Sequence, residues 1–405
     1  MMNKKLQTTF LLTFGHCGID WLHSLLTSNS KILIMPALSF FRVWRYLDLE
    51  LVKDKNVIYK RLKFYFENIV GPESKNKQKR LFNNYSDLNR FIHLLEKNIK
   101  KIDNDNSLKY EIFYTLHYCY AVTKKINFEE CKIIVSHEHM PWPFEEILNV
   151  FSNTKILMII RDPRASFAGF FHGIRKKFGY LPEYTFNQEF ETWVHGEKMY
   201  KKYKKKLDKR FKIVRNESMH FNLEKEMRSI CNWLNLEFNS KMLSGTFGDQ
   251  TKALPDTQYV DPSKKDFNYD EYYLPENIRN RWLKEFEDTN YILIIEALLK
   301  NLMLEFNYNF IYKNNFIFRL KGFALFFMPN KEFLMKWKKE YPLIEEFSKV
   351  ELYLKKNHLN IFHFIWKILP NKIKFLLIYN RSVILRLRIF LFPGNRSRRY
   401  YKKII

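Results

Sequence analysis

Short apolar runs alternate with longer stretches of helical periodicity along the first 240 residues of the chain. The isoleucine-rich run Lys155–Ile160 has the length and composition of a buried strand. Strands that alternate with helices predict an α/β fold, a three-layer sandwich around a central and mostly parallel sheet. The runs expected to form this sheet are residues 8–14, 31–35, 131–135, 155–160 and 211–214.

The pattern also suggests how the chain is divided. Residues 1–309 are predicted to form the α/β domain, and the helical periodicity of residues 40–125 predicts a helical insertion within it. From residue 310 onward bulky aromatic residues alternate with lysine, and residues 352–405 contain 13 Lys or Arg and no Asp or Glu. We therefore expect residues 310–405 to form a separate, basic and aromatic helical region.

Polar residues follow the central strand at once. The segment Arg161-Asp162-Pro163-Arg164 comes directly after Ile160, and Pro163 stands where the first turn of a helix would begin. Ligands of open α/β sheets bind beyond the carboxyl ends of the strands, and helix N-termini bind anions. Arg161 is therefore a candidate anion ligand, although two arginines that pair with local carboxylates would give the same pattern.

A second strand, turn and helix occurs near the N-terminus. Residues 8–14 are followed by the tight turn Gly15-His16-Cys17-Gly18, and then by a helix with an apolar face. Such a turn directs backbone N–H groups toward a phosphate.

Together the two segments resemble the PAPS-dependent sulfotransferases, whose donor is 3′-phosphoadenylyl sulfate (PAPS) and whose fold is similar to that of P-loop NTPases. The resemblance implies that the first loop holds the 5′-phosphosulfate and that Arg161 binds the 3′-phosphate. Gly169 takes the place of the usual serine, and we propose Ser166, one helical turn earlier, as its substitute. The donor residues implied in this way are His16, Cys17, Gly18, Ile19, Asp20, Trp21, Arg161, Ser166, Gly169, Thr246 and Phe247.

Besides Gly169, two of these residues depart from the family pattern. His16 stands at the basic position, where a neutral imidazole would hold the phosphosulfate less firmly than arginine or lysine. Asp20 replaces a threonine, and its carboxylate repels phosphate unless it points away, meets a lysine or contacts the acceptor.

The candidate base lies in Ser136-His137-Glu138-His139, which follows the strand at 131–135. Sulfotransferases commonly place a catalytic histidine after this strand. We choose His137, which leaves the strand first, with Glu138 and His139 as the other candidates. No metal is predicted, because the segment lacks H-E-x-x-H spacing and a third ligand is missing from it.

Charge and cysteine content bear on partners and compartment. The net charge of +26 favours an anionic partner, although a genome rich in lysine codons would also produce it. The basic region at 310–405 suggests contact with an anionic membrane surface, whereas a recognisable nucleic-acid reader is missing and nucleic acid is not an expected partner. Four cysteines without paired spacing favour a reduced, cytoplasmic compartment, with the inner membrane face as the peripheral site.

The sequence therefore predicts an enzyme that moves the sulfuryl group from PAPS to a hydroxyl of a glycan or glycolipid. Two alternatives remain. One is a P-loop kinase-like phosphotransferase, which residues 15–20 disfavour because they lack Gly-Lys-Ser/Thr. The other is a non-catalytic membrane-surface or scaffold protein built on the sulfotransferase fold.

Overall fold

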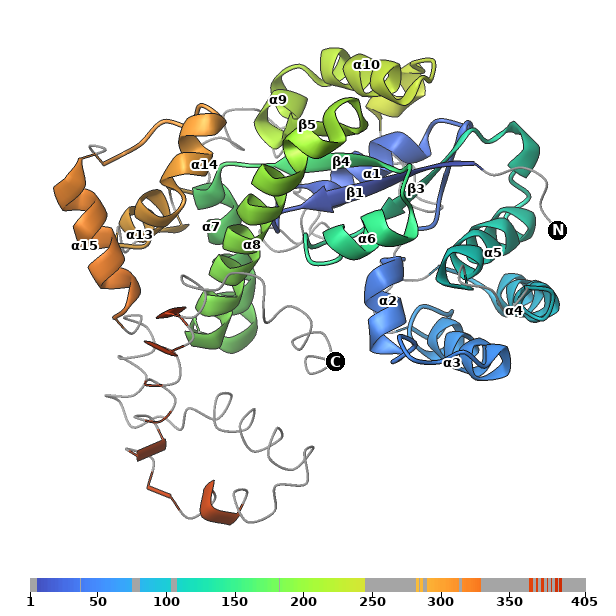
Figure 1. Ribbon diagram of the computed structural model, residues 1–405, viewed down its shortest axis with the longest axis horizontal. Helices are drawn as coiled ribbons and strands as arrows, with labels where there is room; N and C mark the ends of the chain where they lie inside the picture. Colours follow the sequence, from blue (N-terminus) through green and yellow to red (C-terminus); the bar gives the residue numbers. More distant parts are fainter. Residues whose placement is uncertain are drawn as a thin grey trace, which may run out of the picture. The chain divides into compact units, whose positions relative to one another are not determined.

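The computed structural model describes residues 6–244 and 282–328, with short gaps, and scattered residues between 364 and 387. Its centre is a five-stranded sheet in the order β2-β3-β1-β4-β5, and every neighbouring pair is parallel (Figure 1). The predicted α/β fold is confirmed, with a sheet that is wholly parallel. The strands are β1 (Gln7–Thr13), β2 (Ile32–Ile34), β3 (Ile133–His137), β4 (Lys155–Ile160) and β5 (Phe211–Arg215).

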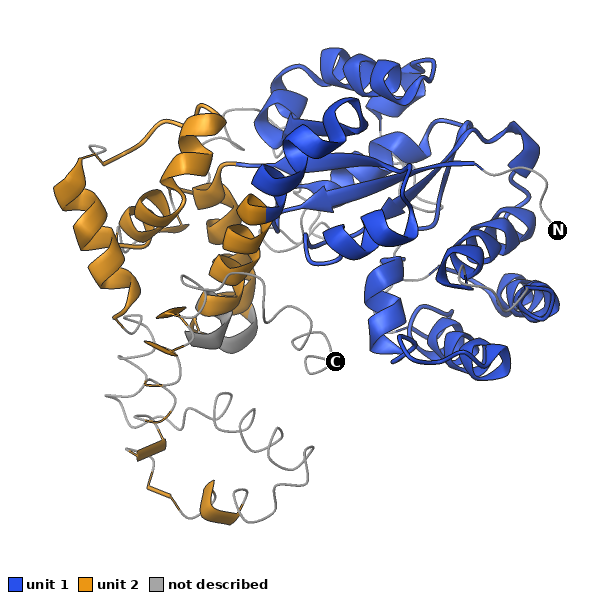
Figure 2. Ribbon diagram, viewed as in Figure 1, with its two compact units in different colours: residues 1–161, 199–255, 396–405 blue, residues 162–198, 256–395 orange. Residues whose placement is uncertain are grey.

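The described residues form two compact units (Figure 2). Unit 1 comprises residues 1–161, 199–255 and 396–405, and unit 2 comprises residues 162–198 and 256–395. This division differs from the boundary predicted at residue 310, because the helices α7 (Pro163–Phe178) and α13 (Asn290–Leu298) fall in the same unit as α15 (Phe316–Phe326). The predicted domain division itself stays a prediction.

Unit 1 surrounds the sheet with helices. In Figure 1, α10 lies above the sheet and α6 below it, while α4 packs against both α3 and α5. Asp54 and Asn84 begin α3 and α4, and each side chain accepts a backbone N–H of the first turn. The helices of this unit are α1 (Ile19–Thr27), α2 (Phe40–Tyr46), α3 (Lys55–Asn68), α4 (Tyr85–Ile99), α5 (Leu108–Thr123), α6 (Phe144–Val150), α9 (Asn216–Phe221) and α10 (Leu223–Leu234), with 3₁₀ turns at Phe128–Glu130, Asp208–Arg210 and Ser240–Leu243.

Aromatic packing fixes the helical insertion to the sheet. Phe10 of β1 is fully buried, and its ring centroid lies 5.0 to 5.8 Å from those of Phe41, Phe113 and Phe151. Aromatic pairs at such distances add to the free energy gained by burying their surface. This cluster holds α2 and α5 against the sheet, and it places the backbone of Phe41 next to the residues that follow β3.

Unit 2 is helical in its described part. It contains α7 (Pro163–Phe178), the first part of α8 (Glu183–Leu207), α13 (Asn290–Leu298), α14 (Lys300–Glu305) and α15 (Phe316–Phe326). Helix α13 packs against α7 and α15. Gly322 permits the close crossing, because a Cβ there would lie 2.7 Å from the carbonyl oxygen of Leu293. Within the described residues, no helix combines the length and the apolar character needed to span a bilayer.

Candidate active site

The carboxyl ends of the strands in unit 1 lie at one edge of the sheet. Leu11 of β1 pairs with His137 of β3 on one side and with Leu157 of β4 on the other. Because the strands are parallel, the glycine turn after β1, the histidines after β3 and Arg161 after β4 all emerge at this edge. The sequence predicted this arrangement correctly.

The turn after β1 has an unusual backbone conformation. Gly15, His16 and Gly18 all have positive φ, at 116°, 43° and 84°. Gly18 also approaches α9 closely, because a Cβ at this position would lie 2.4 Å from Nδ2 of Asn216. The buried Asn216 is thus part of the support for this loop, a role that the sequence pattern did not indicate.

The neighbouring donor-loop residues are held by local contacts. The thiol of Cys17 is buried and donates to the carbonyl of Gly15, so only the backbone of Cys17 is left for a ligand. The ring of Trp21 stacks on His220, with centroids 4.0 Å apart. The roles predicted for Cys17, Ile19 and Trp21 in donor binding stay predictions.

Histidines and one carboxylate gather around the end of β3. The Nδ1 atoms of His23 and His137 lie 3.0 Å apart, and Oδ1 of Asp20 lies 3.7 Å from Nδ1 of His137. The ring centroids of His137 and His139 are 4.3 Å apart. Asp20 therefore lies beside the candidate base.

Burial favours the neutral form of His16, His23 and His137. It lowers the pKa of His16 and of His23 to about 4, and the pKa of His137 well below its usual value. The proximity of His139 and Arg161 lowers the pKa of His16 further, while the Asp20 carboxylate acts in the opposite direction. At neutral pH His137 is therefore unprotonated, as a base must be, and His16 lacks the charge of an arginine.

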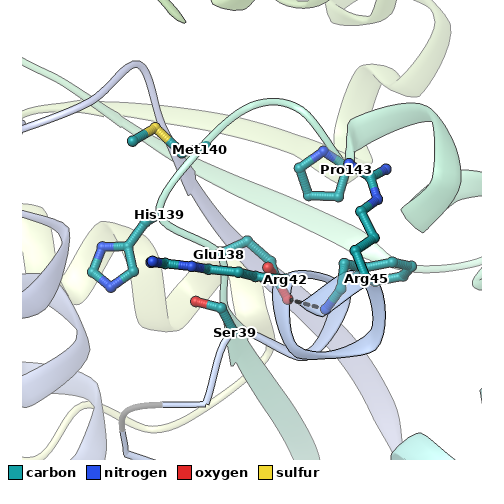
Figure 3. A pocket seen from close by; sticks show the side chains of 8 residues that line it. Ser39, Arg42, Arg45, Glu138, His139, Met140 and Pro143 are labelled. Carbon is teal, nitrogen blue, oxygen red and sulfur yellow. Dashed lines mark hydrogen bonds between the residues drawn. The ribbon is translucent and has the colours of Figure 1, made fainter. Parts of the chain in front are cut away.

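The Glu138 side chain contacts the start of α2. Its carboxylate is buried and accepts the backbone N–H of Phe41 at 3.1 Å (Figure 3). Burial raises the pKa of Glu138 to about 8, so most molecules carry a proton there at neutral pH. The pocket that it lines with Arg42 and His139 has a volume of about 10 Å³, room for about one water molecule. Among the three candidates, Glu138 is thus less suited than His137 to act as the base.

Arg161 is half-buried, and its Nε is a buried donor with no hydrogen-bond partner among the described residues. Buried donors of this kind are costly unless a partner satisfies them. An anionic group would do so, which agrees with the expected role of Arg161 at a phosphate.

The residues after Arg161 belong to unit 2, where Arg164 has a structural role. It forms ion pairs with Asp162 at 2.7 Å and with Glu296 of α13 at 2.6 Å, and it is 4% exposed. The hydroxyl of Ser166 is buried and donates to Glu189 at 3.5 Å, so Ser166 would have to exchange this partner to bind a phosphate. Gly169 is buried in α7, and Thr246 and Phe247 lie outside the described residues.

His23 is a further residue of the site that was not predicted from the sequence. It lies three positions after Asp20 on α1, and such a spacing places two side chains on one helix face. The spacing of three residues between Asp20 and His23 was thus the signal in the sequence that could have indicated His23.

A model of the sulfotransferase family matches residues 16–240, more than half of the chain. The chain belongs to the sulfotransferase family. The matched range contains most of the glycine turn, the histidines after β3 and Arg161.

Two solved sulfotransferase domains resemble the structure. One, from the curacin biosynthetic pathway, is 14% identical, covers 76% of this chain and 100% of its own, and has a TM-score of 0.44. The other, from the Synechococcus PCC 7002 olefin synthase, is 15% identical, covers 70% of this chain and 90% of its own, and has a TM-score of 0.42. No curated protein matches the chain significantly.

Proposed function

We propose that this sulfotransferase moves the sulfuryl group from PAPS to a hydroxyl of a glycan or glycolipid, with His137 as the base. The observation that carries the proposal is that an unprotonated histidine, a glycine turn and an arginine lie at one edge of the sheet, and that Nε of the arginine has no hydrogen-bond partner in the described part of the chain. This is what transfer between a phosphorylated donor and a neutral hydroxyl requires.

Each residue has a defined part in the reaction. His137 accepts the proton of the acceptor hydroxyl as its oxygen forms a bond to sulfur, and the bond between sulfur and the 5′-phosphate oxygen breaks. Arg161 binds the 3′-phosphate, and the backbone N–H groups of residues 17–20 stabilise the charge that develops on the 5′-phosphate. The residues present fit the donor, although the neutral His16 contributes less charge than the basic residue common in the family.

The surroundings of His137 indicate how the acceptor approaches. His137 is 3% exposed, whereas the Asp20 side chain beside it is 62% exposed and His139 is half-buried. The acceptor hydroxyl would therefore reach the base from the side of Asp20 and His139. In this arrangement the Asp20 carboxylate would contact the acceptor. Contact with the acceptor is one of the conditions under which a carboxylate is tolerated next to the phosphate site.

The first experiment is a calorimetric titration of the full chain with 3′-phosphoadenosine 5′-phosphate (PAP), beside ATP with magnesium. Micromolar binding of PAP, about −8 kcal/mol, with weaker binding of ATP supports the donor site. Tighter binding of ATP with magnesium would favour the kinase-like alternative, and no binding of either would favour the scaffold alternative. Transfer of label from ³⁵S-labelled PAPS to a panel of oligosaccharides and glycolipids would then identify the acceptor.

Contact with an anionic membrane is a second part of the proposal. Helix α15 exposes Phe316 and Ile317, 75% and 73% accessible, in a segment that also carries the exposed Lys321. Apolar side chains beside lysine are typical of helices that bind anionic bilayer surfaces. We expect the full chain to sediment with vesicles that contain phosphatidylserine, and less with vesicles of phosphatidylcholine alone. Phe316→Ser with Ile317→Ser should weaken this binding, and unchanged sedimentation of the double variant would contradict the role of α15.

A further inference from the structure

Two histidines and one carboxylate beside the proposed base have the arrangement of metal ligands. Asp20, His137 and His139 each offer a ligand atom, and these atoms all lie within 4.8 Å of one another. We propose that the three residues bind a divalent transition-metal ion, best fitted by Zn²⁺, and that the bound ion inhibits the enzyme. The inhibition rests on the proposed function, whereas the binding of the ion does not.

The chemistry of the three ligands suits zinc. Imidazole nitrogens and carboxylate oxygens are common zinc ligands, with bond lengths of about 2.0–2.2 Å. Two ligand atoms of a tetrahedral zinc ion are then about 3.3 Å apart, and the 3.7 Å between Oδ1 of Asp20 and Nδ1 of His137 is close to that spacing. Burial also keeps His137 in the unprotonated form that metals bind.

The site needs the fold to assemble. His137 and His139 lie two residues apart at the end of β3, and the third ligand comes from the first turn of α1. Asp20 and His137 are far apart in the sequence, so a peptide that contains only the segment around His137 would have two of the three ligands. With three protein ligands, a fourth position stays open, as in zinc sites that accept water or substrate.

The more exposed ligands provide an entry path and some freedom of movement. The Asp20 side chain is 62% exposed and His139 is half-buried, so both can move the short distance that closes the site around an ion. His137 is the fixed member, because it belongs to β3 and is held in the register of the sheet.

An ion at this site would prevent His137 from acting as a base. With the ion on Nδ1, the neutral imidazole carries its proton on Nε2, so Nε2 has no free lone pair with which to accept the proton of the acceptor hydroxyl. Binding through Nδ1 would also replace the contact with His23 at 3.0 Å, which orients the ring. The ion would therefore compete with catalysis, and this is opposite to the activating role of a catalytic zinc.

The binding test uses the full chain, freed of metal by chelator and desalted. Calorimetric titration with ZnCl₂ should show one strong site per chain, and titration with CoCl₂ should produce the visible absorption of tetrahedral cobalt. Asp20→Asn and His139→Gln should each weaken zinc binding at least tenfold. His93→Gln, an exposed histidine of α4 in the same unit, is the matched control and should bind as the wild type does. Equal affinity in the wild type and in both site variants, or no strong site, would overturn the proposal.

The inhibition is tested separately, by transfer of label from ³⁵S-labelled PAPS. Zinc at saturating concentration should reduce transfer by the wild type at least tenfold, and chelator should restore it. Zinc that binds at the site without reducing transfer would overturn the inhibitory role. If transfer is absent with and without zinc, the proposed function and the inhibition fail together, while the calorimetry still decides the metal site.

Discussion

The Nδ1 atoms of His23 and His137 lie 3.0 Å apart, with the two rings edge to face. A hydrogen bond between two Nδ1 atoms requires one ring to donate and the other to accept. When His137 donates from Nδ1, its Nε2 carries a lone pair, and this buried atom has no hydrogen-bond partner among the described residues. His23 is therefore placed to select the tautomer in which His137 can act as a base.

We predict that His23→Phe lowers kcat at least tenfold, because the ring of His137 loses the partner that fixes its tautomer. The proximity of His23 also lowers the pKa of His137, so its removal should move the acid limb of the pH–rate profile toward higher pH. A purely structural role would not move that limb. Affinity for PAP should stay unchanged, and His93→Phe serves as the control; a variant with the wild-type kcat and pH profile would contradict the positioning role.

We predict that Arg161→Ala weakens PAP binding by about 1.5–3 kcal/mol, because a charged hydrogen bond to the 3′-phosphate is lost. Calorimetric titration measures the change directly. Arg228→Ala is the matched control, since Arg228 pairs with Glu224 on the surface of α10 in the same unit. Wild-type affinity in the Arg161 variant would remove this residue from the phosphate site.

A third prediction concerns stability. Glu296 is 4% exposed, pairs with Arg164 and accepts the backbone N–H groups of Ile311 and Tyr312. Glu296→Ala would leave the buried Arg164 charge with less compensation, and we expect a loss of about 3–5 kcal/mol in the free energy of unfolding. Urea denaturation measures it. Glu305→Ala on α14, an exposed position in the same unit, should change the free energy by far less, and equal changes in the two variants would contradict the argument.

The fold could be predicted from the sequence because its sheet is buried. Continuous apolar runs such as Lys155–Ile160 identify strands of a parallel sheet, and the runs at 8–14, 131–135 and 211–214 agree with the structure to within two residues at either end. The direction of the strands alone indicates the edge at which ligands of a parallel sheet bind, because they bind beyond the carboxyl ends of the strands. That is why the glycine turn, His137 and Arg161 were placed together correctly.

The contacts between distant side chains could not be predicted in this way. The pairing of Arg164 with Glu296 joins residues 132 positions apart, and the sequence offers many acidic partners. The approach of Asn216 to Gly18 depends likewise on how α9 meets the first loop. His23, in contrast, could have been found from the sequence, because the helical period places it on the same helix face as Asp20.

A last prediction concerns the pH dependence of stability through Glu138. Burial raises the pKa of Glu138 from 4.5 to about 8 in the folded protein, so between these values the folded state holds a proton that the unfolded state releases. The contribution of Glu138 to the free energy of unfolding therefore falls as the pH rises through this range, and this contribution is complete only below the unfolded pKa.

Glu138→Gln keeps an oxygen that can accept the N–H of Phe41 but cannot ionise, so it should remove the contribution of this residue. Urea denaturation at about pH 5 and about pH 8 should show that the variant gains more stability, or loses less, than the wild type as the pH rises. Buried histidines such as His16 and His23, whose pKa values are lowered to about 4, contribute a change of the opposite sign equally to both proteins. The buried Glu189, whose pKa burial also raises to about 8, adds a fall of the same sign in both proteins, so the difference between them isolates Glu138. Glu129→Gln, at an exposed position in the same unit, should leave the wild-type slope unchanged. If the free energy of unfolding changes equally with pH in Glu138→Gln and in the wild type, Glu138 is ionised in the folded protein at neutral pH. Glu138 would then be as good a candidate for the base as His137.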